Sequence, residues 1–293
     1  MPITRVGLVA KTGLDAAAGA LAELAGWLEA RDVHAVFETD TATLVGLPPD
    51  RRTVDRDELP LACDLVVVLG GDGTLIGMAD RIAESGADVA ILGVNFGSLV
   101  FLTEITLPEL YPSLEAVLGG TAEIEERMML RSRTLRGGAV EADRLALNDV
   151  VITKGALSRI IDLEVAIGDR HVMRVRADGL IIASPTGSTA YNLAAGGPIL
   201  HPEVDALLLT PIAPHMLTNR PVVVPASSEV RVRPAVNASN EEVFVTIDGQ
   251  SGHPLQSDDE ICITRADRPL RLVRASTRTY FDVLRQKLKW SER

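Results

Sequence analysis

The chain has 293 residues, about the length of two domains at roughly 150 residues each. Hydrophobic residues make up 46% and charged residues 24%, so a sizeable core can form, and a net charge of -11 excludes a general DNA- or RNA-binding surface. A local basic pocket for one small phosphate ligand stays compatible with this composition.

The sequence also argues against a disulfide scaffold and a membrane segment. Only Cys63 and Cys262 occur, far apart and without a CxxC pair. The longest stretch without Asp, Glu, Lys or Arg runs over 179–202, and it contains three prolines and four glycines, which a membrane helix does not tolerate. We therefore expect a cytoplasmic protein in a reducing compartment, with no membrane partner.

The first third alternates short apolar runs with helical patterns. Apolar runs predict strands over 5–10, 33–37, 65–69 and 89–94, and helical spacing predicts helices over 17–28, 74–83 and 107–118. This alternation predicts an α/β domain, with a Rossmann-like parallel sheet covered by helices, over residues 1–125.

After residue 126 the pattern becomes all-β. Alternating runs predict strands over 128–134, 145–153, 161–167, 171–176, 180–184, 207–211, 222–224, 230–232, 243–248, 260–264 and 270–274. Phe281, Leu284 and Leu288 recur at helical spacing near the end of the chain. We expect an all-β domain over 126–276, and a segment over 277–293 whose helix packs back on the first domain.

The strongest local signal is Gly70-Gly71-Asp72-Gly73, which follows an apolar strand and precedes a helix. Glycines at such a turn let backbone amides approach a phosphate closely. A carboxylate repels phosphate, so Asp72 makes sense as a group that accepts a proton or hydrogen bond from a hydroxyl to be phosphorylated. The structural alternative is a tight turn in which Asp72 caps the helix.

Two shorter signals lie elsewhere in the chain. Asn95 lies between Gly93 and Gly97 at a predicted strand end, where its amide points to the same ligand crevice or bonds its own backbone. Asn148-Asp149 interrupts an apolar strand, so at least one of the two faces a polar site, unless the pair marks a strand-edge turn.

The most specific stretch runs over 174–198. Hydroxyl-bearing and small residues crowd 184–190, and such hydroxyls suit a site that binds sugar and phosphate oxygens. Arg176 and Asp178 at its start suit opposite parts of one charged ligand. The alternative is a glycine-rich loop with an internal ion pair.

Together these segments resemble the NAD kinase family, in its bacterial ATP-NAD kinase form. The resemblance rests on 70–74, 93–102, 147–150, 178–191, 196–198, 214–221, 248–250 and 287–290, in order from about Val66 to the end of the chain. Lipid kinases and phosphofructokinases share the GGDG element, but not the stretch from Asp178 to Pro198. Val100 stands where that family usually has glycine.

The resemblance implies that the chain uses ATP and a divalent metal, Mg²⁺, to phosphorylate the 2′-hydroxyl of the adenosine ribose of NAD. Asp72 would be the catalytic base, with Gly70, Gly71, Gly73 and Asn95 at the ATP phosphates. The NAD site would be lined by Asp72, Gly73, Asn148, Asp149, Arg159, Arg176, Asp178, Thr189, Ala190, Tyr191, Asn192, Ala194 and Gln250. The metal would be carried by ATP phosphates rather than by protein side chains.

The resemblance also implies a homodimer or homotetramer with sites near the subunit interface. Two rival functions stay open at this point. A lipid kinase would share the GGDG element, but 184–191 is too polar for an acyl groove. A non-catalytic NAD or ATP sensor would bind through the same loops, although a phosphate binder gains nothing from a carboxylate at position 72.

Overall fold

The computed structural model describes residues 3–47, 53–97, 101–155, 160–216, 218–235, 242–274 and 278–290. The chain divides into two compact units, residues 1–126 with 270–293 and residues 127–269. An α/β unit and an all-β unit are what the alternation of patterns predicts, and the fold prediction is confirmed. Within the described residues, no helix is long and apolar enough to cross a membrane.

The first unit is built on a mixed sheet of eight strands over its described residues, in the order β3-β2-β1-β4-β5-β20-β7, with β6 beside β5. Its elements are β1 (Arg5–Ala10), α1 (Ala17–Glu29), β2 (His34–Glu38), α2 (Thr39–Val45), β3 (Thr53–Val54), α3 (Leu59–Ala62), β4 (Leu65–Gly70), α4 (Asp72–Ser85), β5 (Ala90–Asn95), β6 (Ile105–Thr106), the 3-10 helix η1 (Leu107–Glu109), α5 (Leu110–Leu118), β7 (Ile124–Arg127), β20 (Leu270–Val273) and α7 (Tyr280–Leu288). The pairs β1–β2, β1–β4 and β4–β5 are parallel, as the sequence predicts.

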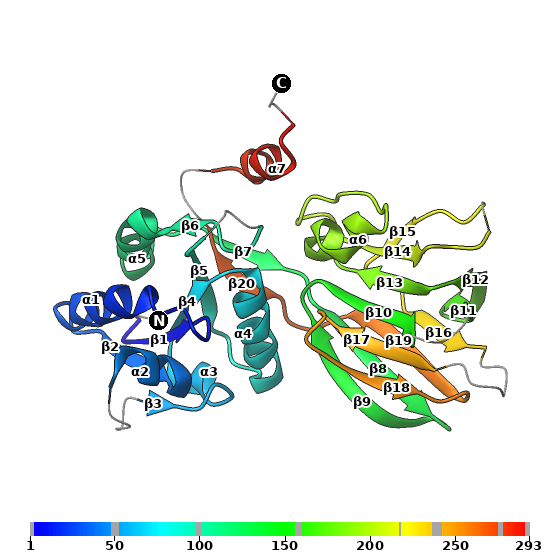
Figure 1. Ribbon diagram of the computed structural model, residues 1–293, viewed down its shortest axis with the longest axis horizontal. Coiled ribbons are helices and arrows are strands. Elements are labelled where there is room, and N and C mark those ends of the chain that lie inside the picture. The colour runs from blue at the N-terminus through cyan, green and yellow to red at the C-terminus, as the bar shows by residue number, and fades with distance from the viewer. Residues whose placement is uncertain are drawn as a thin grey trace. The chain divides into compact units, whose positions relative to one another are not determined.

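The central strands of this sheet are apolar on both faces because helices cover both. Leu65, Val67 and Leu69 of β4 pack with α1 and α5, whereas Val66 and Val68 on the opposite face are equally buried. This arrangement explains why β4 reads as an unbroken apolar run. Strands β4 and β5 lie side by side and run parallel (Figure 1), so their carboxyl ends, at Gly70 and Asn95, meet at one edge of the sheet.

The chain returns to the first unit earlier than the expected boundary at residue 276. Strand β20 pairs in parallel with β5, through Arg271 with Ala90 and Leu272 with Ile91. Helix α7 belongs to the same unit and begins with a capping box between Thr279 and Asp282. Sheet pairing is non-local, so the sequence predicts a strand at 270–274 without saying which sheet it joins.

The second unit contains two antiparallel sheets of six strands each over its described residues. Their orders are β15-β14-β13-β10-β17-β18 and β12-β11-β16-β19-β8-β9. The elements are β8 (Leu130–Arg136), β9 (Ala139–Ala146), β10 (Asp149–Lys154), β11 (Ile161–Ile167), β12 (Arg170–Ala177), β13 (Gly179–Ala183), the 3-10 helix η2 (Thr186–Thr189), α6 (Tyr191–Ala194), β14 (Ala206–Ile212), β15 (Val222–Pro225), β16 (Val230–Pro234), β17 (Val243–Ile247), β18 (Ser251–Leu255) and β19 (Asp259–Arg265).

A single apolar core is formed by the facing sides of these sheets. Val150 and Ile152 of β10 join the same buried cluster as Leu163 and Val165 of β11. In β11 these buried residues alternate with the more exposed Asp162 and Glu164, which is the two-residue period of a strand, whereas Val151 between Val150 and Ile152 of β10 is buried as well. The sheets thereby form a rigid base for the loops that follow β13 and β17.

One predicted strand is wrong in a way that matters for the site. The sequence predicts one strand over 145–153, but β9 ends at Ala146 and β10 begins at Asp149, so Leu147 and Asn148 lie between two strands. Each of these two strands belongs to a different sheet. An apolar run does not reveal such a switch, because Leu147 is buried like its neighbours.

Candidate active site

Asp72 is the first residue of α4 and lies directly after the end of β4. Its Oδ1 accepts the backbone N–H groups of Leu102 and Thr103 at 3.0 and 3.1 Å, and its Oδ2 accepts that of Phe101 at 3.0 Å. The cap position of the helix is Gly71, without a side-chain cap. Asp72 therefore fixes the segment after the second glycine region instead of capping its own helix.

The electrostatics of Asp72 combine burial with compensating donors. Burial raises the pKa of Asp72, while the three N–H donors and then the Lys287 ammonium oppose that rise, and the net direction is upward. A carboxylate has about four acceptor sites. Three hydrogen bonds leave Oδ2 with capacity for one more donor, such as a substrate hydroxyl.

Lys287 reaches this region from α7, at the far end of the chain. Its Nζ lies 6.0 Å from the ring centroid of Phe101, the residue whose N–H binds Asp72. Helix α7 is fixed nearby through Arg278, which donates to the carbonyl of Glu104 at 2.5 Å and to the Glu109 carboxylate. Sequence reasoning noted 287–290 only as part of the resemblance and assigned Lys287 no role.

The glycines of the first turn differ in exposure. Gly70 is buried at the end of β4, Gly71 is half-buried and Gly73 is exposed in the first turn of α4. Helix N-termini offer unpaired N–H groups and a positive dipole end to anions. Gly73 is therefore the accessible member of this turn, and the phosphate site there stays a prediction.

Asn95 ends β5, beside the end of β4, with Gly70 opposite Asn95 in the register. Its Oδ1 accepts the N–H of Gly97 at 2.6 Å, which is the local turn that the structural alternative predicts. Gly93 lies inside β5 instead of at its end, where a Cβ would come within 2.6 Å of Leu75 and 2.8 Å of Thr103. This glycine serves close packing. Val100 lies outside the described residues.

In the second unit, Asn148 and Asp149 are fixed by one carboxylate. Asp248 accepts the N–H groups of Leu147, Asn148 and Asp149 at 2.7, 2.7 and 2.9 Å. Asp149 is 4% exposed, and burial followed by the negative charge of Asp248 raises the pKa of its carboxyl group to about 7. Asn148, at 9% exposure, is nearly as buried.

The hydroxyl-rich loop after β13 packs against the same backbone. Ser184 donates its hydroxyl to the carbonyl of Leu147 at 2.5 Å, and its N–H donates to the carbonyl of Asn148 at 2.9 Å. The N–H of Gly187 donates to the Ser184 hydroxyl at 3.1 Å. The structure thus brings two of the predicted segments together, although they are more than 30 residues apart.

Asn192 is fully buried and holds the shape of this loop. Its Nδ2 donates to the carbonyls of Ser188 and Pro198, both at 3.0 Å, and its Oδ1 accepts the hydroxyl of Thr210 at 2.6 Å. A Cβ on Gly197 would overlap its side-chain amide. These contacts give Asn192 a structural task that its place in a polar motif does not reveal.

Arg176 and Asp178 lie at the junction of β12 and β13. Arg176 is exposed, and its carbonyl accepts the N–H of His215 at 2.8 Å. Asp178 is ion-paired with Lys154, whose Nζ lies 3.0 Å from Oδ1. Sequence reasoning missed Lys154, because a lysine at the end of a strand carries no signal until its cross-strand partner is known.

The remaining predicted residues are accessible from solvent to different degrees. Thr189 and Ala190 are half-buried, whereas Tyr191, Ala194 and Gln250 are exposed. Exposed Tyr191 opens α6, directly after η2. Arg159 lies outside the described residues.

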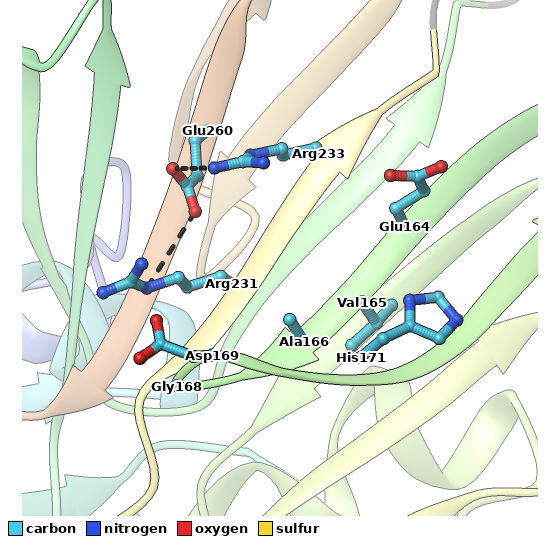
Figure 2. A pocket seen from close by; sticks show the side chains of 9 residues that line it. All are labelled: Glu164, Val165, Ala166, Gly168, Asp169, His171, Arg231, Arg233 and Glu260. Carbon is cyan, nitrogen blue, oxygen red and sulfur yellow. Dashed lines mark hydrogen bonds and ion pairs between the residues drawn. The ribbon is translucent and has the colours of Figure 1, made fainter.

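A separate pocket of about 290 Å³ opens on the sheet that contains β11 and β16, and Figure 2 shows its lining side chains. Arg233 lies 3.0 Å from Glu260, and Arg231 lies 3.9 Å from Glu260 and 2.5 Å from Glu229. Carboxylates neutralise both guanidinium groups, and none of the residues predicted from the sequence lines this pocket. It lies outside the candidate site.

Comparisons with known proteins agree with this arrangement. The model of the ATP-NAD kinase N-terminal domain matches residues 6–122, and that of the ATP-NAD kinase C-terminal domain matches residues 147–275. An NAD kinase of Geotalea daltonii is 50% identical over 289 residues, covering 99% of both chains.

The chain is also similar to solved structures of NAD and NADH kinases, at lower sequence identity. A crystal structure of yeast NADH kinase complexed with NADH is 26% identical with a TM-score of 0.85, covering all of this chain and 89% of that one. An NAD kinase from Archaeoglobus fulgidus in complex with ATP is 25% identical with a TM-score of 0.75, covering 96% of this chain and 99% of that one.

Proposed function

The chain belongs to the NAD kinase family and is an NAD kinase enzyme, and we propose that the γ-phosphoryl group of ATP passes to the 2′-hydroxyl of the adenosine ribose of NAD, giving NADP. The observation that carries the proposed mechanism is Asp72, a carboxylate at a glycine-rich strand-to-helix turn with one acceptor site left for a hydroxyl.

Asp72 is the proton acceptor in this proposal. Its Oδ2 receives a hydrogen bond from the 2′-hydroxyl and takes its proton as the oxygen attacks the γ-phosphorus. Burial raises the pKa of Asp72, which makes it a stronger base than an exposed aspartate. Its three backbone donors hold the carboxylate in one orientation, and phosphoryl transfer depends mainly on such positioning.

The glycine turn receives the phosphates of ATP. Gly73 lies in the first turn of α4, where backbone N–H groups have no partner within the helix and the helix dipole favours anions. We assign Gly70, Gly71 and Gly73 to the approach of the backbone to phosphate oxygens, and Asn95 to the neighbouring strand end. In this assignment the carboxylate of Asp72 binds the 2′-hydroxyl of NAD and does not contact the phosphates.

The second unit holds NAD. Asn148 and Asp149 offer amide and carboxyl groups to adenine amino and ribose hydroxyl groups, and Arg176 with Asp178 suits the charged and polar parts of the dinucleotide. The contacts further include Thr189, Ala190, Tyr191, Ala194, Gln250 and Arg159. Asn192 contributes by holding the loop, through the internal hydrogen bonds of its buried amide.

Magnesium enters this proposal with the nucleotide. Within the described residues, no three His, Cys, Asp or Glu side chains gather into a metal site. We assign the ion to the phosphates of ATP, because Mg²⁺ is commonly bound through substrate phosphates with only one or two carboxylates. When bound, the ion neutralises phosphate charge. Every proton movement proposed here belongs to Asp72.

We further propose a cytoplasmic protein that works as a homodimer or homotetramer. Cys63 and Cys262 are both buried free thiols, and burial raises the pKa of Cys63 to about 12, so it stays a thiol. Reduced cysteines suit a reducing compartment. The subunit state is carried over from the family, and size-exclusion chromatography with light scattering tests it.

The reaction is tested by incubating the purified protein with NAD, ATP and Mg²⁺ and measuring NADP with an NADP-specific dehydrogenase. We expect NADP only when all components are present. NAD binding without any NADP would instead favour the sensor alternative. Formation of a phosphorylated lipid in place of NADP would favour the lipid-kinase alternative, which none of the comparisons supports.

A further inference from the structure

Asp248 carries an unusual number of hydrogen bonds for one side chain. It follows β17 with a left-handed φ of 50°, which directs its carboxylate back toward β10. Oδ2 accepts the N–H of Leu147, and Oδ1 accepts those of Asn148 and Asp149, all within 2.9 Å. Its own N–H donates to the carbonyl of Asp149 at 2.9 Å.

These contacts replace sheet pairing where the chain leaves it. Leu147 and Asn148 lie between β9 and β10, so the peptides there are not fixed by a regular ladder. Three successive N–H groups that converge on one anion form the kind of nest that usually binds a phosphate. Here the anion is the chain's own carboxylate, and the conformation of Asn148 depends on it.

The other side of Asn148 is also held. The N–H of Ser184 donates to its carbonyl at 2.9 Å, and Gly187 packs against the same carbonyl without room for a side chain. The backbone of Asn148 is therefore clamped between Asp248 and the hydroxyl-rich loop. Because the backbone of Asn148 is fixed, its side chain leaves the backbone in a defined direction, which recognition of a base or a sugar requires.

The charge of Asp248 acts on Asp149 as well. Burial and then Asp248 raise the pKa of Asp149 to about 7. The two strands that pair with β10, β13 and β17, carry no titratable side chain. Strand β8, which also contacts β10, carries the partly exposed Arg131, Arg133 and Arg136. Arg131 and Arg136 are ion-paired with Asp143 and Asp259.

We propose that Asp248 is a positioning residue for NAD: its carboxylate fixes the backbone of Asn148 and Asp149 so that their side chains meet the nucleotide. The inference rests on the proposed NAD site. Asp248 acts through its two neighbours and does not touch the reacting atoms.

The test compares Asp248→Asn with Asp258→Asn, a matched control on an exposed turn of the same unit. NAD binding is measured by calorimetry between pH 5.5 and 8.5, and ATP binding in parallel. We expect Asp248→Asn to weaken NAD binding by about tenfold to a hundredfold, the scale of hydrogen bonds to a charged group, with ATP binding unchanged.

The pH profile separates positioning from a merely structural role. Removing the negative charge lowers the pKa of Asp149, so the midpoint of the pH dependence of NAD binding should move to lower pH in Asp248→Asn and stay in place in Asp258→Asn. In Asp149→Asn the midpoint should vanish. If Asp248→Asn does not fold, Asp248→Glu keeps the charge, and we expect it to bind NAD more weakly at an unchanged midpoint.

Three outcomes would overturn the inference. NAD affinity and pH midpoint equal to wild type in Asp248→Asn would show that the three N–H groups do not depend on this carboxylate. A fall in kcat at unchanged NAD affinity would make Asp248 a catalytic group instead. Weaker NAD binding by Asp248→Glu with a shifted midpoint would show that the negative charge at position 248 does not set the midpoint. Failure of the wild-type protein to bind NAD would instead reject the proposed function.

Discussion

Gly187 lies directly against the backbone carbonyl of Asn148, so closely that a Cβ at position 187 would overlap the carbonyl oxygen. The two residues come from different segments of the predicted site, and Ser184 links the same segments through hydrogen bonds. Only glycine fits at position 187, because any side chain there would displace the peptide of Asn148.

Gly187→Ala should therefore displace the Asn148 backbone and weaken NAD binding. We expect a lower melting temperature and an NAD affinity reduced by about tenfold, because overpacking a rigid site costs about 1–3 kcal/mol. Gly26→Ala, in α1 with no atom within 4 Å of the added methyl, is the control and should be neutral or stabilising. Equal NAD affinity in both variants would contradict this prediction.

Asp72→Asn should lower turnover by about 10²–10⁴-fold, the usual contribution of a general base. NAD should still bind, because the contacts proposed for it lie mainly in the second unit. Steady-state assay of NADP formation and calorimetry with NAD together test this prediction. A variant that retained more than roughly a tenth of the wild-type rate would rule out a base role for Asp72.

Lys287→Ala should move the acid limb of turnover to higher pH. The Lys287 ammonium lowers the pKa of Asp72, so its removal raises that pKa, and the base becomes ionised only at higher pH. We expect Lys287→Arg to keep the wild-type limb and Lys289→Ala, two residues further along the chain, to leave it unchanged. Profiles of kcat against pH measure the shift, and coincident limbs for Lys287→Ala and wild type would refute the coupling.

Arg176→Ala should weaken NAD binding by about tenfold, the scale of one charge-assisted hydrogen bond, with ATP binding intact. Arg174→Ala is the matched control, since Arg174 lies two residues earlier on the same face of β12 and is ion-paired with Asp162 at 3.4 Å. Calorimetry with NAD compares the two. Unchanged affinity in Arg176→Ala would remove that residue from the site.

Local features of the sequence predicted much of the fold. Strands β1 and β11 have the bounds that the apolar runs predict, and α1 extends one residue beyond the predicted helix. The short strand β18 escaped prediction, because its sequence SGHPL has few apolar residues and contains a proline. Apolar periodicity reflects the burial of side chains within one element, so it does not predict a strand whose side chains are mostly exposed.

The candidate site was predictable in part for the same reason. The GGDG turn and the stretch over 184–198 can be recognised in the sequence, because small and polar residues form continuous runs there. The break at Leu147 and Asn148 gives no such local signal, since the carboxylate that binds its backbone N–H groups belongs to Asp248, 100 residues away from Asn148 along the chain. The ion pair between Lys154 and Asp178 likewise depends on β10 and β13 being neighbours, because Asp178 directly precedes β13.

The sequence by itself determined the two-part architecture and the family and indicated the segments of the candidate site, because periodicity and glycine-rich turns are properties of short stretches. Only the tertiary structure decided how those segments hold one another: Asp72 through Leu102, Asn148 through Asp248, and Lys287 beside Phe101. The physical reason is that a hydrogen bond or a shifted pKa depends on distances across several ångströms. Such distances are set by sheet register and packing, which no local stretch of sequence encodes.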